Sequence, residues 1–391
     1  MKNKTINNSR VAIYRDSGFE LTDAYITSKA FADETKHEHE PELYIYSRYR
    51  NPTVVAAEKE IMRLEGSKWA LLTQSGMSAI DIALSIFQDG KKVKPWLFFS
   101  EIYGGTISFA ENILKRKRGL DIRSFVPVNE KYDLRAFELV MKKLKPEIVY
   151  IEAISNPMLI VPDAEAVIAI ARKHRAKIII DNTFATPYLW KPLQSGADIV
   201  IHSATKYFSG HGNLTAGVLC GNNAAYMKAA IEYRKFVGHM ISADDAYRLH
   251  TQIQTFSLRF RQQCFNASMV AEILVRSDKV HKVWYPGLKG HSTHKESMKL
   301  FGDKGSGGMV TFDFAGNSGP EKRRRRDRFI KAVSENIKLI PTLGDPRTIL
   351  MPVEAVWGAK YPEPGMIRLS AGFENTDELL STIISALKSI K

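Results

Sequence analysis

Short apolar runs alternate with amphipathic stretches from residue 51 onward. The runs are rich in β-branched residues and lack apolar–polar alternation, which is typical of strands buried on both faces of a sheet. Helical patterns separate them, at 78–87, 107–117, 134–144 and 164–174. This order predicts an α/β fold with three layers and a mostly parallel central sheet. The predicted strands are WALLT (69–73), WLFF (96–99), IRSFVPV (122–128), IVYIEA (148–153), KIIID (177–181) and DIVIHS (198–203).

The pattern differs at both ends of the chain. Residues 1–50 are polar and irregular, and we expect an extended N-terminal arm there. After residue 256 a long helical stretch reaches Asp278, and the last helix is expected from Thr376. Between them lie strand patterns at 307–316 and 366–372 and a helix near 328–338. We therefore predict three parts: the arm (1–50), a large α/β domain (51–256) and a smaller C-terminal α+β domain (257–391).

The composition is that of a water-soluble globular protein, with 44% hydrophobic and 25% charged residues. No run approaches the ~20 consecutive apolar residues of a membrane span. The basic start has no apolar run behind it, so we expect no secretory signal. The only two cysteines, Cys220 and Cys264, make no disulfide framework and lack metal-ligand spacing. These features predict a cytoplasmic protein with no metal site and no membrane contact.

Charge is the one unusual feature of the composition. Lys and Arg number 56 against 42 Asp and Glu, a formal net charge of +14, which suits anionic ligands. The densest run is EKRRRRDR (321–328). No aromatic residue interrupts it as a stacking platform for nucleic acid would require. We interpret it as a solvated helix face, with a non-catalytic nucleic-acid-binding protein as the alternative from another functional class.

The segment SATKYFSGHG (203–212) carries the sharpest chemical signal. Lys206 follows a predicted strand, so it should emerge at the carboxyl edge of the sheet, where α/β proteins bind ligands. Ser203 and Thr205 flank it with hydroxyls. Burial at such a place lowers the proton affinity of a lysine and makes it a usable nucleophile. A solvated surface lysine is the alternative.

Asp181 ends the predicted strand KIIID, at the same edge of the sheet. A carboxylate there can pair with the ring nitrogen of pyridoxal 5′-phosphate (PLP) and keep it protonated. The turn TQSGMSAI (73–80) opens a helix, and the Gly76 and Met77 amides would form an anion site. Tyr103 follows another strand and could stack on a cofactor ring. A capping aspartate, an ordinary βα turn and a core tyrosine are the alternatives.

Stretches from residue 46 to residue 374 resemble, in order, one enzyme family. They are YSRYRNPT (46–53), SGMSAI (75–80), YGGT (103–106), EAISNP (152–157), DNTFATP (181–187), SATKY (203–207), GHGNLTAG (210–217), LGD (343–345) and IRLSAGFE (367–374). The set resembles the Cys/Met-metabolism family of fold-type I PLP enzymes, which includes cystathionine and methionine γ-lyases and related synthases and sulfhydrylases.

The resemblance implies roles for the catalytic and ring-binding residues. Lys206 would carry the cofactor as a Schiff base and move protons, and Asp181 would pair with the ring nitrogen. Tyr103 would stack on the ring and protonate the leaving group. Asn156 would lie at or near the cofactor's phenolic oxygen. Arg368 would bind the substrate carboxylate, for which a guanidinium is well suited.

The resemblance also implies the phosphate site and the assembly. The Gly76 and Met77 amides and the Ser203 and Thr205 hydroxyls would hold the phosphate. Tyr46 and Arg48 would reach the phosphate of a neighbouring subunit, so that sites are shared across a dimer within a homotetramer. Taken singly, Arg48 and Arg368 are surface cations, Tyr46 is a packing aromatic and Asn156 is a turn residue.

Four positions and one segment bear on the substrate. Asn213 stands where methionine γ-lyases often have an acidic residue, and Gly105 replaces a cysteine that many of them carry. Pro341 and the substrate-pocket residue Thr342 stand where cystathionine γ-lyases tend to have Glu-Ser, which favours a more apolar pocket. The segment between Met351 and Met366 is also shorter than usual for the family.

We therefore predict a PLP-dependent carbon–sulfur lyase that acts on a small sulfur amino acid by α,γ-elimination, as methionine γ-lyase does. The alternatives within the family are a γ-replacement transferase (O-acetylhomoserine sulfhydrylase or cystathionine γ-synthase) and a cystathionine lyase.

Overall fold

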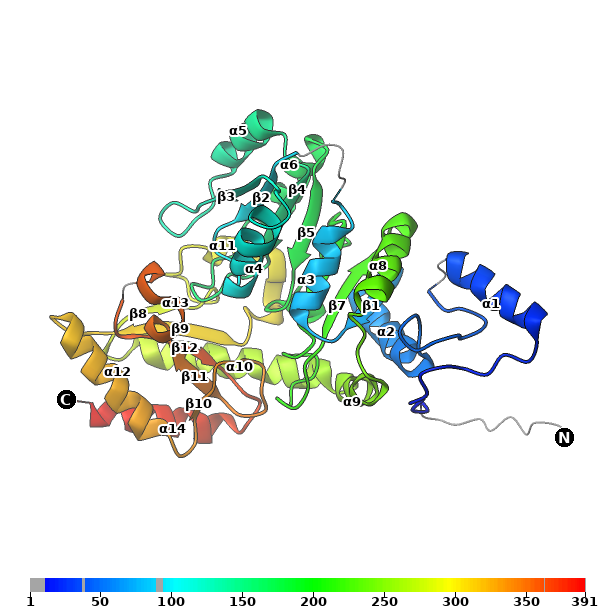
Figure 1. Cartoon of the computed structure of the whole chain (residues 1–391). Coiled ribbons are helices and arrows are strands. Elements are labelled where there is room, and N and C mark those ends of the chain that lie inside the picture. Colours follow the sequence, from blue (N-terminus) through cyan, green and yellow to red (C-terminus); the bar gives the residue numbers. More distant parts are fainter. Residues whose placement is uncertain (1–10, 37–38, 89–93, 362, 391) are drawn as a thin grey trace.

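A seven-stranded sheet forms the centre of the computed structural model, which describes residues 11–36, 39–88, 94–361 and 363–390 (Figure 1). The strand order is β1-β7-β6-β5-β4-β2-β3. Neighbouring strands are parallel except where β7 lies antiparallel to β1 and β6. The predicted mostly parallel sheet is therefore confirmed. The strands are β1 (Trp69–Thr73), β2 (Trp96–Phe99), β3 (Ile122–Phe125), β4 (Ile148–Glu152), β5 (Lys177–Asp181), β6 (Ile199–His202) and β7 (Gly217–Gly221).

The strand β7 was missing from the sequence prediction. Its sequence GVLCG begins and ends with glycine, which weakens a strand pattern. Both glycines allow close packing, because a Cβ on Gly217 would lie 2.1 Å from Ser75 O and one on Gly221 would lie 2.5 Å from the Trp69 ring. Tertiary packing therefore selects these glycines against the local strand propensity.

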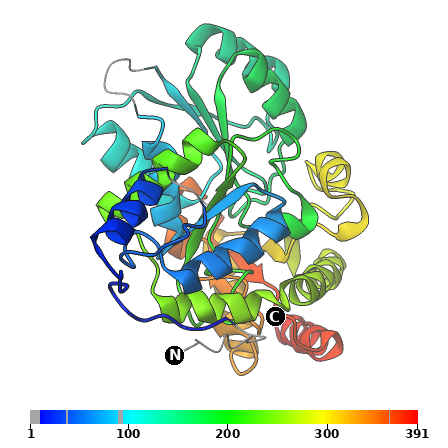
Figure 2. The same cartoon turned by 90° about the vertical axis from the view of Figure 1, so that its right-hand side faces the viewer.

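Helices lie on both sides of this sheet (Figure 2). The helix α3 packs on β6, β7 and β1, and α6 packs on β5. A π-helical turn (Ala110–Lys115) continues α4 within the predicted helix 107–117. The helices of this part are α2 (Pro52–Glu65), α3 (Gly76–Ser85), α4 (Gly104–Phe109), α5 (Leu134–Leu144), α6 (Ala164–Lys173), α7 (Thr186–Leu189), α8 (Ala224–Val237) and α9 (Ala243–Ile253).

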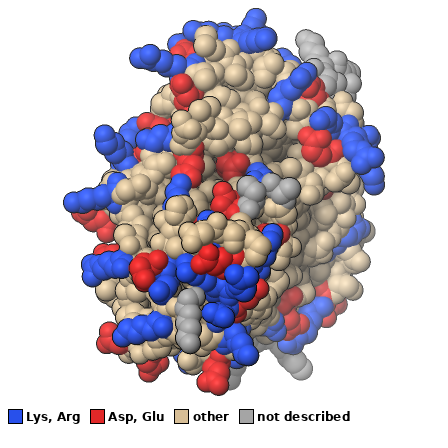
Figure 3. Space-filling model, turned by 90° about the vertical axis from the view of Figure 1, so that its left-hand side faces the viewer, with Lys and Arg blue, Asp and Glu red and all other residues tan. Residues whose placement is uncertain are grey.

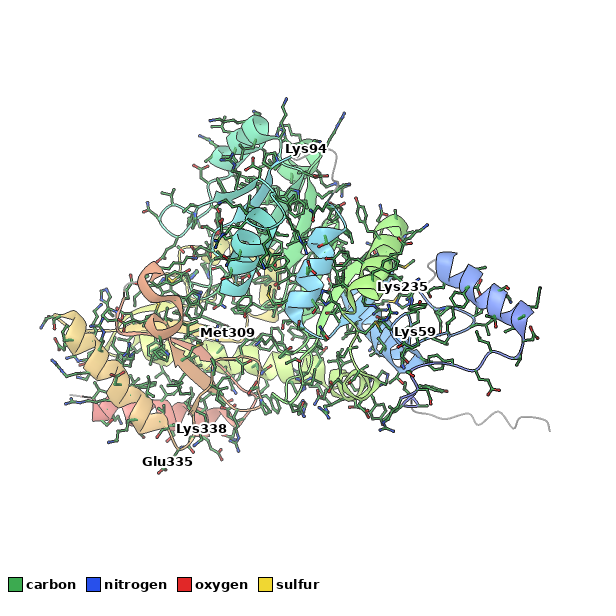
Figure 4. All side chains as sticks on the ribbon, viewed as in Figure 1. Lys59, Lys94, Lys235, Met309, Glu335 and Lys338 are labelled. Carbon is green, nitrogen blue, oxygen red and sulfur yellow. The ribbon has the colours of Figure 1, made fainter. Side chains whose placement is uncertain are left out.

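The N-terminal segment projects from the large sheet and contains the helix α1 (Ala24–Lys36) (Figure 1). The expectation of a wholly irregular arm is wrong for these residues. Asp23 accepts a hydrogen bond from Ile26 N at 2.8 Å and caps the helix start. The labelled residues Lys59 and Lys235 lie on the side facing this segment (Figure 4) and bind its carboxylates, Lys59 to Glu40 at 2.5 Å and Lys235 to Glu34 at 3.8 Å.

A second, five-stranded sheet has the order β10-β11-β12-β9-β8 and a hydrophobic cluster of its own. The helix α10 (Phe256–Val275) joins the two parts, since its first half packs in the core of the large sheet and its second half in the smaller core. The remaining elements are β8 (Val280–Trp284), α11 (His294–Phe301), a 3₁₀ turn (Gly302–Lys304), β9 (Met309–Phe314), α12 (Gly319–Val333), β10 (Lys338–Leu339), β11 (Ile349–Pro352), α13 (Glu354–Trp357), a 3₁₀ turn (Gly358–Lys360), β12 (Met366–Ser370) and α14 (Thr376–Ser389).

Across the described residues, no helix combines the length and apolar character that crossing a bilayer requires.

The helix expected near 328–338 is displaced toward the N-terminus, because α12 begins at Gly319 and ends at Val333. Ser318 accepts from Glu321 N and caps the helix, so the whole basic run lies inside it. The labelled residues Glu335 and Lys338 lie beyond its end (Figure 4), and Lys338 begins β10.

Candidate active site

One cavity of about 270 Å³ lies where β4, β5 and β6 end and meet the loop before β11 and the strand β12. Every predicted site residue lines it except Tyr46 and Arg48. The lining is Ser75, Gly76, Met77, Ile80, Tyr103, Glu152, Ile154, Asn156, Asp181, Thr183, Phe184, Ser203, Thr205, Lys206, Thr215, Pro341, Thr342, Leu343 and Arg368.

Lys206 projects into this cavity from the turn after β6. Its Nζ donates a hydrogen bond of 2.7 Å to Thr342 Oγ1. Burial, and then the positive charge of Arg368, lower the pKa of Lys206 to about 8. The following turn is fixed by Arg259 of α10, which donates to Tyr207 O and Phe208 O at 3.0 Å each. Gly210 has φ +64° there, and a Cβ on it would collide with that guanidinium.

Two carboxyl groups stand side by side at the ends of neighbouring strands, since Asp181 of β5 pairs in register with Glu152 of β4. Asp181 Oδ1 accepts from Thr183 N at 2.9 Å, and Glu152 Oε1 accepts from Tyr103 N at 2.6 Å. Burial raises the pKa of Asp181. Burial and then the nearby Asp181 raise the pKa of Glu152 well above its ordinary value.

Glu152 had no role in the sequence prediction. The signal was present, because Glu152 ends the apolar run IVYIE as Asp181 ends KIIID, and parallel strands present such ends at one edge. Thr183, Phe184 and Thr215 also line the cavity without having been predicted.

A cradle for an anion lies at the start of α3. Ser75 caps this helix by accepting from Ser78 N at 3.1 Å, and the Gly76 and Met77 amides occupy its first turn, where backbone N–H groups have no helical partner. A Cβ on Gly76 would lie 3.1 Å from Ser203 Oγ, so glycine keeps this space open. Thr205 Oγ1 holds the loop together, since it donates to Ala216 O at 3.1 Å and accepts from Ala216 N at 2.9 Å.

Arg368 is 5% exposed and lies in the cavity wall. It donates to Asn156 Oδ1 at 3.0 Å and to Thr342 O at 2.9 Å. Its Nε is buried with no hydrogen-bond partner. Burial lowers the pKa of Arg368 to about 10, so the side chain stays cationic near neutral pH. A buried cation with an unused donor at a cavity is suited to a carboxylate.

The aromatic Tyr103 is 48% exposed at the cavity. A Cβ on Gly105 would lie 2.4 Å from the Tyr103 ring, so the ring occupies the space that a side chain at position 105 would need. Tyr46 and Arg48 lie outside the cavity of their own chain. Arg48 donates to Lys235 O at 2.6 Å and lies over the rings of Tyr46 and Tyr49. Their reach into a neighbouring subunit stays a prediction.

These side chains fit pyridoxal phosphate: an amine of lowered pKa for an aldehyde, a carboxyl group for a ring nitrogen, and a glycine-lined helix start for a phosphate. Residues 1–388 match the family model described as Cys/Met metabolism PLP-dependent enzyme. The chain belongs to this family. The predicted PLP dependence, enzymatic function and PLP-transferase fold type I are therefore confirmed, and the alternative of a non-catalytic nucleic-acid-binding protein gains no support.

Known members of the Cys/Met metabolism family resemble the chain over most of its length. It is 34% identical to L-methionine gamma-lyase of Pseudomonas putida over 88% of this chain and 85% of the relative. It is 33% identical to cystathionine beta-lyase of Lactococcus lactis subsp. cremoris, over 89% of this chain and 90% of the relative. A solved structure of cystathionine gamma synthase from Xanthomonas oryzae pv. oryzae superposes with a TM-score of 0.86 at 25% identity, over 99% of this chain and 94% of that one. The chain is therefore a PLP-dependent lyase or transferase of this family.

Proposed function

We propose that this enzyme is a carbon–sulfur lyase that converts a sulfur amino acid such as methionine, together with water, into a thiol, ammonia and a ketoacid by α,γ-elimination. The observation that carries the proposal is the convergence of Lys206, Asp181 and Arg368 on one cavity. The likeness to the methionine γ-lyase of Pseudomonas putida supports the choice of substrate.

Bound pyridoxal phosphate supplies an electron-withdrawing ring conjugated to the substrate's α-carbon. In the proposal, the Asp181 carboxylate keeps the proton on the ring nitrogen. The Lys206 amine would take the proton from Cα and then a proton from Cβ, because it would be held within reach of both. Loss of the Cβ proton would allow the sulfur to leave from Cγ. The Tyr103 hydroxyl donates a proton to the departing sulfur. Arg368 binds the carboxylate, and the cradle of Gly76, Met77, Ser203 and Thr205 holds the phosphate.

The composition of the cavity wall supports a substrate with a single charged end. Within the described residues, Arg368 is the one guanidinium of the lining. Cystathionine carries a second amino-acid group, and we propose that it would face Pro341, Thr342 and Leu343 of the cavity wall. Methionine ends in a methyl group, which suits these side chains.

The test is an assay of purified enzyme with methionine, homocysteine and cystathionine for ketoacid and thiol. We expect ketoacid from methionine, with Lys206→Ala as the inactive control. Rapid incorporation of sulfide into O-acetylhomoserine without ketoacid from any sulfur amino acid would instead establish the γ-replacement reaction, which the likeness to cystathionine gamma synthase supports. Ketoacid from cystathionine alone would establish a cystathionine lyase.

We also propose that the enzyme works as a cytoplasmic homotetramer whose sites are shared across each dimer. The exposed Tyr46 and Arg48 would complete the phosphate site of a neighbouring subunit. Cys220 and Cys264 are both free and buried, which fits a reducing compartment.

A further inference from the structure

Two arginines from the basic run of α12 form hydrogen bonds with Glu354, the first residue of α13. Arg323 Nε donates to Glu354 Oε1 and Oε2 at 3.1 Å, and Arg326 Nη1 donates to Glu354 Oε2 at 2.9 Å. The hydrogen bond from Arg323 is the main cause that lowers the pKa of Glu354 to about 2. The face that carries α12 and α13 accordingly shows basic and acidic side chains interspersed (Figure 3). The expectation that this run is a plain solvated face is therefore incomplete.

Residues 353–361 include α13, and their C-terminal end contacts the loop that carries Tyr103. Lys360 Nζ donates to Ser100 O at 3.0 Å and lies 3.3 Å from Glu101 Oε1. Tyr361, which is 7% exposed, donates its hydroxyl proton to Glu101 Oε2. Glu101 is two residues before Tyr103. Residues 353–361 therefore connect the smaller sheet to the loop after β2.

Trp357 stands in the middle of this segment and covers Arg368. The Arg368 Cζ atom lies 5.4 Å from the centre of the Trp357 ring, within the range of a cation–π contact. The Trp357 ring packs edge-on to Tyr361 at 6.4 Å and is partly buried against the cluster that contains Val353. Trp357 is not among the residues that line the cavity, and Arg368 is the lining residue whose guanidinium it covers.

We propose that Trp357 is a positioning residue for recognition of the substrate carboxylate, held in place by residues 353–361 as a strap. It covers one face of the guanidinium, while Asn156 and the Thr342 carbonyl hold two of its edges. The Nε edge is left as the free donor, so a carboxylate binds in the guanidinium plane, where two N–H groups can meet two oxygens. This inference rests on the proposed role of Arg368.

The test measures binding of two matched ligands to the holoenzyme from the change in visible absorption of the bound cofactor. L-Norleucine has the carboxylate and no leaving group, and 1-aminopentane is the same molecule without the carboxylate. Trp357→Ala should weaken norleucine about tenfold and leave 1-aminopentane unchanged. Trp357→Phe should restore most of the norleucine affinity. The neighbouring Val356→Ala, at an exposed position, should change neither.

Perturbation from outside the site provides an independent check. The double variant Arg323→Gln/Arg326→Gln frees Glu354 and should weaken norleucine selectively. Arg324→Gln, an exposed position on the same helix, is its control. Amide hydrogen exchange of residues 354–361 should quicken in the double variant and not in the control.

The inference would be overturned if Trp357→Ala left the dissociation constant for norleucine unchanged, or if it weakened the binding of both ligands equally. In steady-state assays the variant should raise KM for methionine about tenfold and leave kcat within about twofold. If wild-type enzyme forms no ketoacid from methionine yet the norleucine loss is selective, the proposed reaction fails and the positioning role stands. If ketoacid forms and the two ligands respond alike, the positioning role fails alone.

Discussion

Lys206 and Thr342 are 136 residues apart in the chain, yet the Lys206 amine donates a 2.7 Å hydrogen bond to the Thr342 hydroxyl. The contact joins the turn after β6 to the loop before β11, and both residues line the cavity. Thr342 also offers its carbonyl to Arg368 at 2.9 Å. One residue of the smaller part thus contacts both cationic side chains of the cavity.

The lowered pKa of Lys206 predicts how cofactor attachment depends on pH. The amine is protonated below about pH 8 and neutral above it, and only the neutral form attacks an aldehyde. The rate at which cofactor-free protein recovers its visible band should therefore rise through about pH 8 and then level off. Because Arg368 contributes to the lowering, Arg368→Gln should move the midpoint upward. A rate that keeps climbing to pH 10 would contradict a buried amine.

The two paired carboxyl groups should differ in how much activity is lost when each is replaced by its amide. Asp181→Asn removes the carboxylate charge that, in our proposal, pairs with the protonated ring nitrogen. The value of kcat should therefore fall on the order of a hundredfold or more. The raised pKa of Glu152 favours its neutral form, so Glu152→Gln keeps an acceptor for Tyr103 N and should cost less than about tenfold. Steady-state kinetics of the two variants compares them directly. Equal losses would show that both groups act as anions.

Gly217→Ala should distort the backbone at Ser75 and thereby the proposed phosphate site at the start of α3. The added methyl would lie 2.1 Å from Ser75 O, and the backbone before Gly76 would have to move. Overpacking of this kind costs about 1–3 kcal/mol, so we expect a lower Tm and about tenfold weaker cofactor binding, measured by equilibrium titration. Gly290→Ala, where a Cβ meets nothing within 4 Å, is the control. Unchanged cofactor affinity in Gly217→Ala would separate this turn from the phosphate.

Subunit mixing tests whether Arg48 serves a neighbouring site. Arg48→Ala and Lys206→Ala should each be nearly inactive as pure proteins. Reassociated in equal amounts, they should recover about a quarter of wild-type activity, because half of the dimers are hybrids with one intact site. No recovery, with hybrids demonstrated by a tagged subunit, would place Arg48 in the site of its own chain.

The sequence by itself determined six of the seven strands of the large sheet and the place of the chemistry. Buried parallel strands carry continuous apolar runs, so β1 to β6 were predicted from local pattern alone. Because their carboxyl ends share one edge, Asp181 and Lys206 could be brought together without coordinates. Asp23 and Ser318 are residue types that commonly cap helix starts, so the starts of α1 and α12 could also have been predicted from the sequence, although neither start was predicted.

Only the tertiary structure decided the contacts between distant segments. The strand β7 forms because glycine lets it lie against Ser75 and Trp69, which no local propensity records. Glu152 gains its perturbed pKa from burial beside Asp181, and the basic run of α12 gains its role from Glu354, a residue of another helix. Such contacts depend on which elements become neighbours in the folded chain, whereas the period of an apolar pattern shows only which face of an element is buried and does not identify its partner.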